Sequence, residues 1–134
     1  MNKEFEYDLN CSVNCLFHVD SYFITGSLNY MNKLLVVNQQ TNSLMQYDCP
    51  DTPNAIELYI NQMFFIGGCN GTLMLWDSGF NGLYMAQSQG GAITRIKHSG
   101  EVVLTTTSTG MILIWKCVVE PMISIAFCGN LMPS

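Results

Sequence analysis

Charged side chains are scarce in this sequence. Asp, Glu, Lys and Arg make up 11% of its 134 residues, whereas a typical soluble domain contains about 25%. Apolar residues make up 49%, so the chain can build a core. It has few charges with which to keep an exposed surface in water, and we therefore expect much of its surface to be covered.

Positive charge is the scarcer sign, with five basic residues against ten acidic ones and a net charge of −5. The basic residues are scattered apart from one close pair: Lys3, Lys33, Arg95, Lys97 and Lys116. Binding to a phosphate backbone requires clustered Lys and Arg. Direct nucleic-acid binding is therefore disfavoured, and partners are expected to be other proteins.

Long hydrophobic runs are also missing. No stretch reaches the roughly 18 apolar residues that a membrane span needs, and residues 1–6 lack the apolar region of a signal peptide. Asn2 and the C-terminal Ser134 do not fit the common lipidation signals. We expect an intracellular protein, cytoplasmic or nuclear, without a membrane anchor, in which disulfides are improbable.

One stretch of the sequence, residues 66–77, has a well-defined structural pattern. It predicts the end of one strand, a tight turn and a second strand that closes on Trp76-Asp77. The pair Asn70-Gly71 is typical of a type I′ hairpin, which needs positive φ at both central residues. The following residues alternate with the period of two that a strand imposes.

The same pattern returns at residues 105–116. Gly110 stands where Gly71 stood and Trp115 where Trp76 stood, 39 positions later without a gap. A weaker copy lies upstream, where Val37 takes the place of the tryptophan and the turn is longer. A period near 40 that ends in Trp-Asp is the signature of a four-stranded propeller blade.

The sequence therefore resembles the WD40 repeat family, on Gly71, Trp76, Asp77, Gly110 and Trp115 as structural repeat positions. The resemblance implies an all-β fold: a single WD40-like propeller segment over 1–134 with about three four-stranded antiparallel blades. The blades are expected at about 10–48, 54–87 and 91–128. In such proteins an N-terminal strand often completes the last blade, and the alternation of Phe5, Tyr7 and Leu9 fits a short strand.

The predicted inner strands also align between blades. The matched triplets are Val13, Leu16 and His18, then Ala55, Leu58 and Ile60, then Ile93, Ile96 and His98.

The two tryptophan blades depart from the family pattern, in which a His, a Ser or Thr, an Asp and the Trp form a hydrogen-bonded network. Gly68 and Asn70 stand in the Ser and Asp places of one blade, and Thr107 and Thr109 in the other. Neither has a His in the preceding loop. Both tryptophans are therefore expected to satisfy their indole N–H groups with another partner.

Three blades do not close a ring, since propellers have about four to eight. Open sheets expose edges and apolar faces. Two expectations follow. The chain is a truncated or diverged piece of a larger propeller without independent activity, or it pairs with other chains, including copies of itself, to complete one.

The cysteines and histidines form no convincing catalytic or metal site in the sequence. The spacing Cys11-x3-Cys15-x2-His18 is the only cluster with the appearance of zinc ligands, but Cys15 falls within a predicted strand, and buried thiols usually act as small apolar residues. His18 and His98 occupy the same blade position, which suggests a structural role. We predict no catalytic group, no metal and no cofactor; a metal-dependent enzyme is the less favoured alternative.

The remaining prediction is binding. The WD40 resemblance implies a non-catalytic protein–protein interaction scaffold or adaptor that presents loop and channel residues to partner proteins or within a multi-subunit complex. Aromatic and Arg residues are enriched at binding hot spots. The residues predicted to contact a partner are Arg95, Lys97, Tyr59, Phe80 and Tyr84.

Overall fold

The computed structural model describes residues 6–131. This part of the chain is almost entirely β-structure, with one short 3-10 helix, η1 (Leu28–Tyr30). The strands are β1 (Cys15–Val19), β2 (Tyr22–Gly26), β3 (Lys33–Asn38), β4 (Ser43–Asp48), β5 (Pro53–Leu58), β6 (Phe64–Gly68), β7 (Thr72–Trp76), β8 (Gly82–Gln87), β9 (Ile93–Ser99), β10 (Val102–Thr107), β11 (Ile112–Val118) and β12 (Ser124–Leu131). No helix in the described region is long and apolar enough to cross a membrane.

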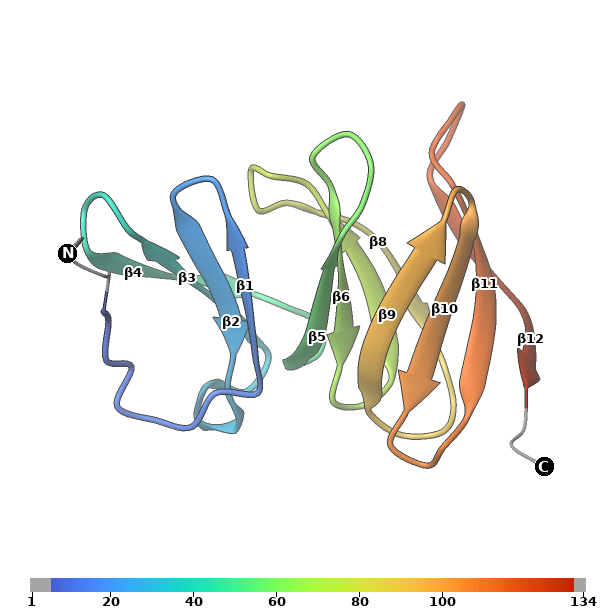
Figure 1. Ribbon diagram of the computed structural model, residues 1–134, viewed down its shortest axis with the longest axis horizontal. Helices are drawn as coiled ribbons and strands as arrows, with labels where there is room; N and C mark the ends of the chain where they lie inside the picture. The colour runs from blue at the N-terminus through green and yellow to red at the C-terminus, as the bar shows by residue number, and fades with distance from the viewer. Residues whose placement is uncertain (1–5, 132–134) are drawn as a thin grey trace, which may run out of the picture.

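The strands form three separate four-stranded antiparallel sheets, each made of four consecutive strands. The sheets stand side by side in chain order, with β1, β5 and β9 as neighbouring inner strands (Figure 1). We call them the first, second and third blade. The predicted all-β fold with three antiparallel blades is confirmed, and the blades do not close into a ring.

Two apolar cores lie between the blades. The first lies between the first and second blades and contains Ile24, Leu34, Phe64 and Met74, all at most 2% exposed. The second core lies between the second and third blades and includes Phe65, Leu73, Leu75, Val103, Leu113 and Trp115. Because side chains alternate across a strand, the middle sheet supplies residues to both cores, and every residue of β6 and β7 is buried.

The predicted hairpins are present, but the turn type differs from the prediction. Gly71 and Gly110 have φ values of +89° and +87°, whereas Asn70 is not in the positive-φ region. The Gly71 amide donates to the Gly68 carbonyl at 3.1 Å, and Gly110 donates to Thr107 at 3.0 Å. This geometry is a three-residue loop that ends on a left-handed glycine, a common alternative to the two-residue type I′ turn.

The inner-strand alignment is correct for the first and third blades and wrong for the second blade. His18 pairs with Phe23 and His98 pairs with Val103 at matching positions. In the second blade this position belongs to Leu58, which pairs with Phe64, and not to Ile60. Five residues separate the paired Leu58 and Phe64, whereas four separate the paired His98 and Val103. A fixed spacing does not reveal this longer turn between β5 and β6.

The two tryptophans have different hydrogen-bond environments. The Trp115 indole N–H donates to Thr105 Oγ1 at 3.0 Å, and both residues are almost fully buried. The Ser/Thr place of this blade is therefore Thr105 and not Thr107 as predicted. The matching residue beside Trp76 is Ile66, and the Trp76 indole makes no hydrogen bond to any residue within 6–131. One blade retains the family's tryptophan–hydroxyl bond, and the other replaces it with apolar contact.

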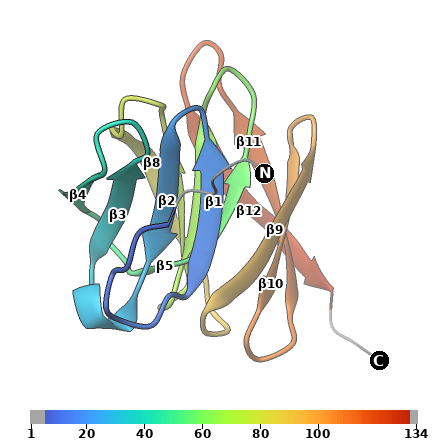
Figure 2. The ribbon, with the colours of Figure 1, turned by 60° about the vertical axis from the view of Figure 1, so that its left-hand side comes forward.

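The segment before β1 forms no strand between residues 6 and 10. It crosses the outward face of the first blade (Figure 2). Tyr7 and Leu9 are half-buried and line a mainly apolar pocket of about 370 Å³ on that face. The predicted N-terminal strand is thus absent over these residues, and its first member, Phe5, lies outside the described residues.

The difference between the tryptophans can be tested. We expect Trp115→Phe to lower the free energy of unfolding more than Trp76→Phe. Both changes remove similar apolar volume, but only the first leaves a buried hydroxyl, that of Thr105, without its partner, at a cost of about 1–3 kcal/mol. Urea unfolding followed by circular dichroism measures both. Equal losses would contradict the assigned role of the Thr105 bond.

Candidate interaction surfaces

Hydrogen bonds across the seams fix the inner strands relative to one another. Asn14 Nδ2 donates to the Pro53 carbonyl at 3.2 Å, and Asn54 Nδ2 donates to the Ile93 carbonyl at 2.9 Å. Both bonds span 39 residues and join one blade to the start of the next. The channel-facing surface is therefore part of a rigid framework.

Further bonds join the second and third blades at the opposite end of the seam. His98 Nε2 lies 2.8 Å from the Leu58 carbonyl, and the Tyr59 hydroxyl donates to the Gly100 carbonyl at 3.0 Å. The Tyr59 and His98 rings meet edge to face, with centroids 5.0 Å apart. His98 thus acts as a structural link between blades, in agreement with the expected structural position.

The inner strands line a shallow groove of about 270 Å³ on the channel side. Arg95 and Lys97 lie on its rim along β9 and are exposed. Neither forms an ion pair with another residue in the described part of the chain. The half-buried Glu57 of β5 lines the same groove. Arg95 and Lys97 thus lie on a groove formed by β1, β5 and β9, and neither has an ion-pair partner within residues 6–131.

The other three predicted contact residues have different environments. Tyr59 is 6% exposed within the second core, and Phe80 is 8% exposed in the first core, where it contacts Tyr22 and Tyr47. Both stabilise the packing of the blades and expose little of their side chains, and their role as contact residues stays a prediction. Tyr84, on the outer strand β8, is 38% exposed and remains accessible.

A buried carboxylate that the sequence did not reveal organises the second blade. Asp51 is 1% exposed. Its carboxylate accepts hydrogen bonds from the Asn70 amide N–H at 2.9 Å, the Asn70 side chain at 3.1 Å and the Thr72 amide at 3.2 Å. In the family pattern the acid lies in the hairpin turn. Here the acid comes from the loop before the blade, and the turn supplies the donors.

Gly68 makes room for this carboxylate, since a Cβ at that position would overlap the Asp51 side chain. In the third blade the arrangement is reversed. Gly90 stands 39 residues after Asp51, and Thr107 stands 39 residues after Gly68. The Thr107 hydroxyl accepts the Met111 amide at 3.2 Å. In the second blade the preceding loop supplies the side chain that fills the turn, and in the third blade strand β10 supplies it.

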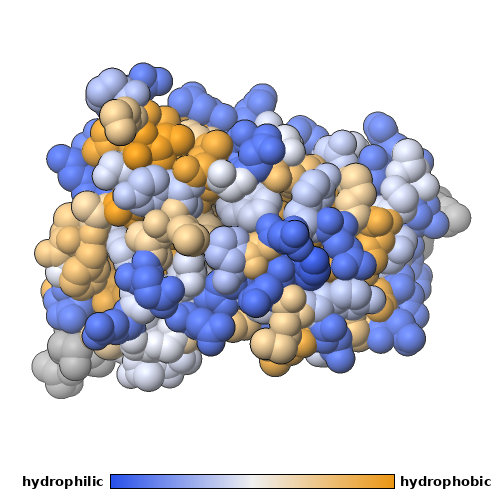
Figure 3. Space-filling view, turned by 180° about the vertical axis from the view of Figure 1, so that it is seen from behind, coloured by the Kyte–Doolittle hydropathy of each residue, from blue (hydrophilic) through white to orange (hydrophobic). Residues whose placement is uncertain are grey.

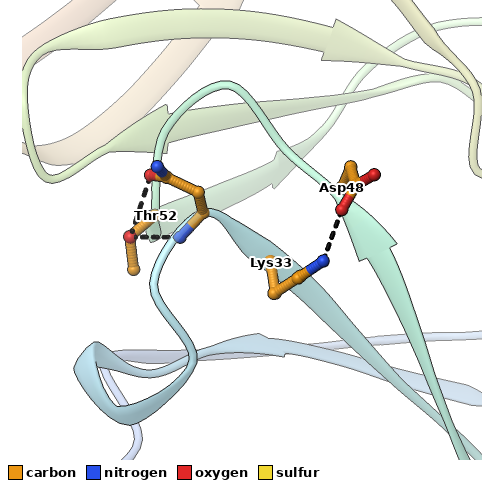
Figure 4. Close-up of polar contacts among 4 residues, drawn as sticks. Lys33, Asp48 and Thr52 are labelled. Atoms are coloured by element: carbon orange, nitrogen blue, oxygen red, sulfur yellow. Dashed lines mark hydrogen bonds and ion pairs between the residues drawn. The ribbon is translucent and has the colours of Figure 1, made fainter.

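The loop that carries Asp51 is anchored to both blades. The Asn32 amide donates to Thr52 Oγ1 at 2.8 Å (Figure 4). The Cys69 amide donates to the Thr52 carbonyl at 2.9 Å. An ion pair between Lys33 and Asp48 closes the end of the first blade beside it. This loop is the covalent and hydrogen-bonded joint between two blades, and it is not a free recognition loop.

Four of the six cysteines have thiols that burial disfavours in the ionised form. Burial raises the pKa of Cys15 to about 12 and that of Cys49 to about 11, and it also raises the pKa values of Cys69 and Cys117. These thiols therefore stay protonated near neutral pH, and the thiolate is the form that attacks or ligates. Within residues 6–131 no group of three or more His, Cys, Asp or Glu side chains could hold a metal ion.

Comparisons with known proteins agree with this geometry. No family model and no curated protein matches the sequence. Solved structures do match its shape. The chain superimposes on U3-55K with a TM-score of 0.71 at 10% identity, covering 96% of this chain and 41% of that one. The crystallised WD40 repeats of RRP9 give 0.70 at 10% identity, again over 96% and 41%.

The fold is that of three WD40 propeller blades. The Cps50 (Swd1) β-propeller domain of Myceliophteria thermophila also matches, with a TM-score of 0.62 at 14% identity, over 84% of this chain and 42% of that one. The WD40 resemblance seen in the sequence is thereby confirmed at the level of fold. The chain spans about two fifths of the length of these solved propellers.

The exchange between Asp51–Gly68 and Gly90–Thr107 predicts a rescue. Asp51→Gly should destabilise the chain by about 1–3 kcal/mol, because two backbone amides lose their acceptor. Gly68→Thr should also destabilise it, because its side chain overlaps Asp51. The double variant recreates the third-blade arrangement and should be more stable than the sum of the singles by at least about 1 kcal/mol. Chemical denaturation of the four proteins measures this coupling.

Gly129 provides the matched control, since a Cβ there meets nothing within 4 Å. Asp51→Gly combined with Gly129→Thr should show additive changes in the free energy of unfolding. Additivity in the Asp51–Gly68 pair as well would show that the two positions do not share one space.

Proposed function

We propose that this chain is a non-catalytic protein-interaction scaffold and that the channel-facing rim of β9 is its contact surface. One observation carries the proposal. Arg95 and Lys97 are two of only five basic residues, both are exposed on a groove, and neither forms an ion pair with a carboxylate of residues 6–131. The complementary partner is a polypeptide segment that presents acidic side chains.

The surrounding structure supports this use. The rim belongs to strands that cross-blade hydrogen bonds hold in place, so little ordering is needed when a partner binds. Exposed Leu16 and half-buried Ile56 line the same groove and add apolar area beside the charges. Tyr84 offers a second contact on the outer side of the second blade, next to a pocket of about 220 Å³.

The proposed contact surface also suggests the kind of assembly to which the chain belongs. A propeller that presents several rigid surfaces suits a subunit of a multi-protein complex, and the proposed location is intracellular, cytoplasmic or nuclear. The alternative, a diverged fragment without activity of its own, is favoured by the fraction of the solved propellers that the chain spans. That alternative predicts a folded chain without a specific binding surface.

The binding of acidic segments tests the proposal. A fluorescent oligoglutamate peptide is titrated with the protein and followed by fluorescence anisotropy. Lys97→Glu should weaken binding by at least about threefold, the value expected from one lost surface charge contact. Lys33→Glu changes the net charge equally but lies away from the groove, so it is the matched control.

An oligolysine peptide of the same length completes the design and should bind more weakly than oligoglutamate. Equal weakening by both Lys substitutions would mean that net charge alone attracts the peptide. That result, or a failure of oligoglutamate to bind at low salt, would overturn the proposed contact surface.

A further inference from the structure

The outward face of the third blade is apolar at its centre and has no covering neighbour within residues 6–131. The third blade stands at the end of the array (Figure 1), and hydrophobic surface gathers at this end of the molecule (Figure 3). Four aliphatic side chains, two exposed and two half-buried, form the centre of the face: Val102, Leu104, Ile112 and Ile114. The strand registers place Leu104 and Ile114 where the second blade has Phe65 and Leu75, each 0% exposed.

The opposite end of the array, in contrast, is covered. Residues 6–13 cross the outward face of the first blade (Figure 2). Three residues at the centre of that face are at most 3% exposed: Thr25, Leu35 and Val37. In the covering segment, half-buried Tyr7 and Leu9 alternate with exposed Glu6 and Asp8. A short segment that combines apolar and acidic side chains is therefore enough to cover the centre of a blade face.

The structure gathers positive charge on the uncovered face, although the sequence scatters it. Arg95 and Lys97 of β9 pair with outward-facing residues of β10, and Lys116 of β11 pairs with Val102. Directly paired residues lie on the same face of a sheet. The outward face of the third blade therefore carries three of the five basic residues of the chain.

Little negative charge opposes these cations. Glu101, in the turn between β9 and β10, lies 3.8 Å from the Lys116 ammonium group. Arg95 and Lys97 form no ion pair with any residue of 6–131. Three cations thus stand against one carboxylate on this face, in a chain whose net charge is −5. A partner with carboxylates beside apolar side chains is complementary to it.

A further blade at the spacing found within the chain does not fit this face. A Cβ on Gly67 would lie 2.4 Å from the Ile93 side chain, so the glycine is what lets the third blade approach the second so closely. Thr106 holds the position of Gly67 in the third blade, and its hydroxyl lies 2.7 Å from that of Thr94. A blade at the same spacing would overlap the Thr106 side chain, whereas a single extended segment can place its side chains on either side of it.

The apolar part of the face also distinguishes a polypeptide from a nucleic acid. Proteins bind single-stranded nucleic acids through basic grooves with aromatic side chains on which the bases stack. The centre of this face is aliphatic throughout. Aliphatic side chains gain free energy by covering other apolar side chains, so the face favours a peptide.

We propose that the outward face of the third blade binds an extended segment of another protein in which acidic residues adjoin apolar ones. The carboxylates meet Arg95 and Lys97 at β9, and the apolar side chains cover Leu104 and Ile114. Neighbouring strands lie about 4.8 Å apart, so crossing from β9 to β11 takes about three extended residues. The inference rests on the proposed function, because it extends the acidic-segment site at β9 across the blade and adds an apolar requirement.

Two fluorescent peptides of equal charge and length test the proposal. One has three glutamates followed by Leu-Ser-Leu, and the other has three glutamates followed by three serines. Only the first can cover the apolar centre of the face. Fluorescence anisotropy at low salt should show that the leucine peptide binds at least about fivefold more tightly than the serine peptide.

Substitutions assign the preference to the face. Leu104→Thr keeps a residue that suits a strand, and it should reduce the preference for the leucine peptide to less than about twofold. Lys97→Glu should weaken the binding of both peptides. Met85→Thr is the matched control, because Met85 is 58% exposed on the outer strand β8, and it should leave the preference unchanged. Leu104→Gln replaces Leu104→Thr if the latter loses its β-sheet circular dichroism.

Three results would overturn the inference. The first is equal binding of the two peptides, or a preference for leucine that survives the change at Leu104. The second is tighter binding of a six-nucleotide oligothymidine than of the leucine peptide, which would make a nucleic acid the occupant. The third is a dimer of the free chain in sedimentation velocity that Leu104→Thr dissociates, which would make a second copy the occupant.

The same measurements separate this inference from the proposed function. If both peptides bind equally and both depend on Lys97, the acidic-segment site at β9 stands and its extension across the third blade is removed. If neither peptide binds at low salt, the acidic-segment site itself is removed, and the extension is removed with it.

Discussion

Apolar contact between neighbouring sheets is the interaction on which the rest of this structure depends. The middle blade fills both cores, so β6 and β7 are buried on both faces and read as continuous apolar runs instead of alternating ones. Phe64 and Phe65, adjacent in sequence, belong to different cores. Each outer blade has one such contact only. The order of the inner strands, and with it the groove of Arg95 and Lys97, follows from this packing.

The sequence predicted the repeat because its signals are local. A glycine with positive φ and a tryptophan five residues later define a hairpin regardless of what surrounds it. Features that depend on contacts across blades were not predictable in this way. The turn between β5 and β6 is one residue longer than the matching turns of the other two blades, and the predicted alignment of β5 was wrong by two residues. The burial of Tyr59 and Phe80 follows from neighbouring strands that no spacing rule reveals, and both had been selected as aromatic contact residues.

Asp51 illustrates a second limit. It lies between Pro50 and Pro53, away from the hairpin turn where the family pattern has its acidic residue, so the family pattern gave no sign of its role. The structure shows that a blade needs acceptors for the turn amides and a filled volume beneath them. Asp51 with Gly68 meets both needs in one blade, and Gly90 with Thr107 meets them in another. Residue identity can change while the physical requirement stays.

The scarcity of charged residues is related to the apolar side chains on the outer sheet faces. A sheet face that met only water would gain solubility from polar residues and lose nothing by carrying them. Leu104 and Ile114 instead keep the residue type of a seam, and the nearest charges, Arg95 and Lys97, lie at the edge where carboxylates could meet them. At the other end of the array, residues 6–13 lie across the outward face of the first blade, where Leu35 and Val37 are at most 3% exposed. The third blade thus keeps an apolar centre on an uncovered face, and solvation alone would not require it.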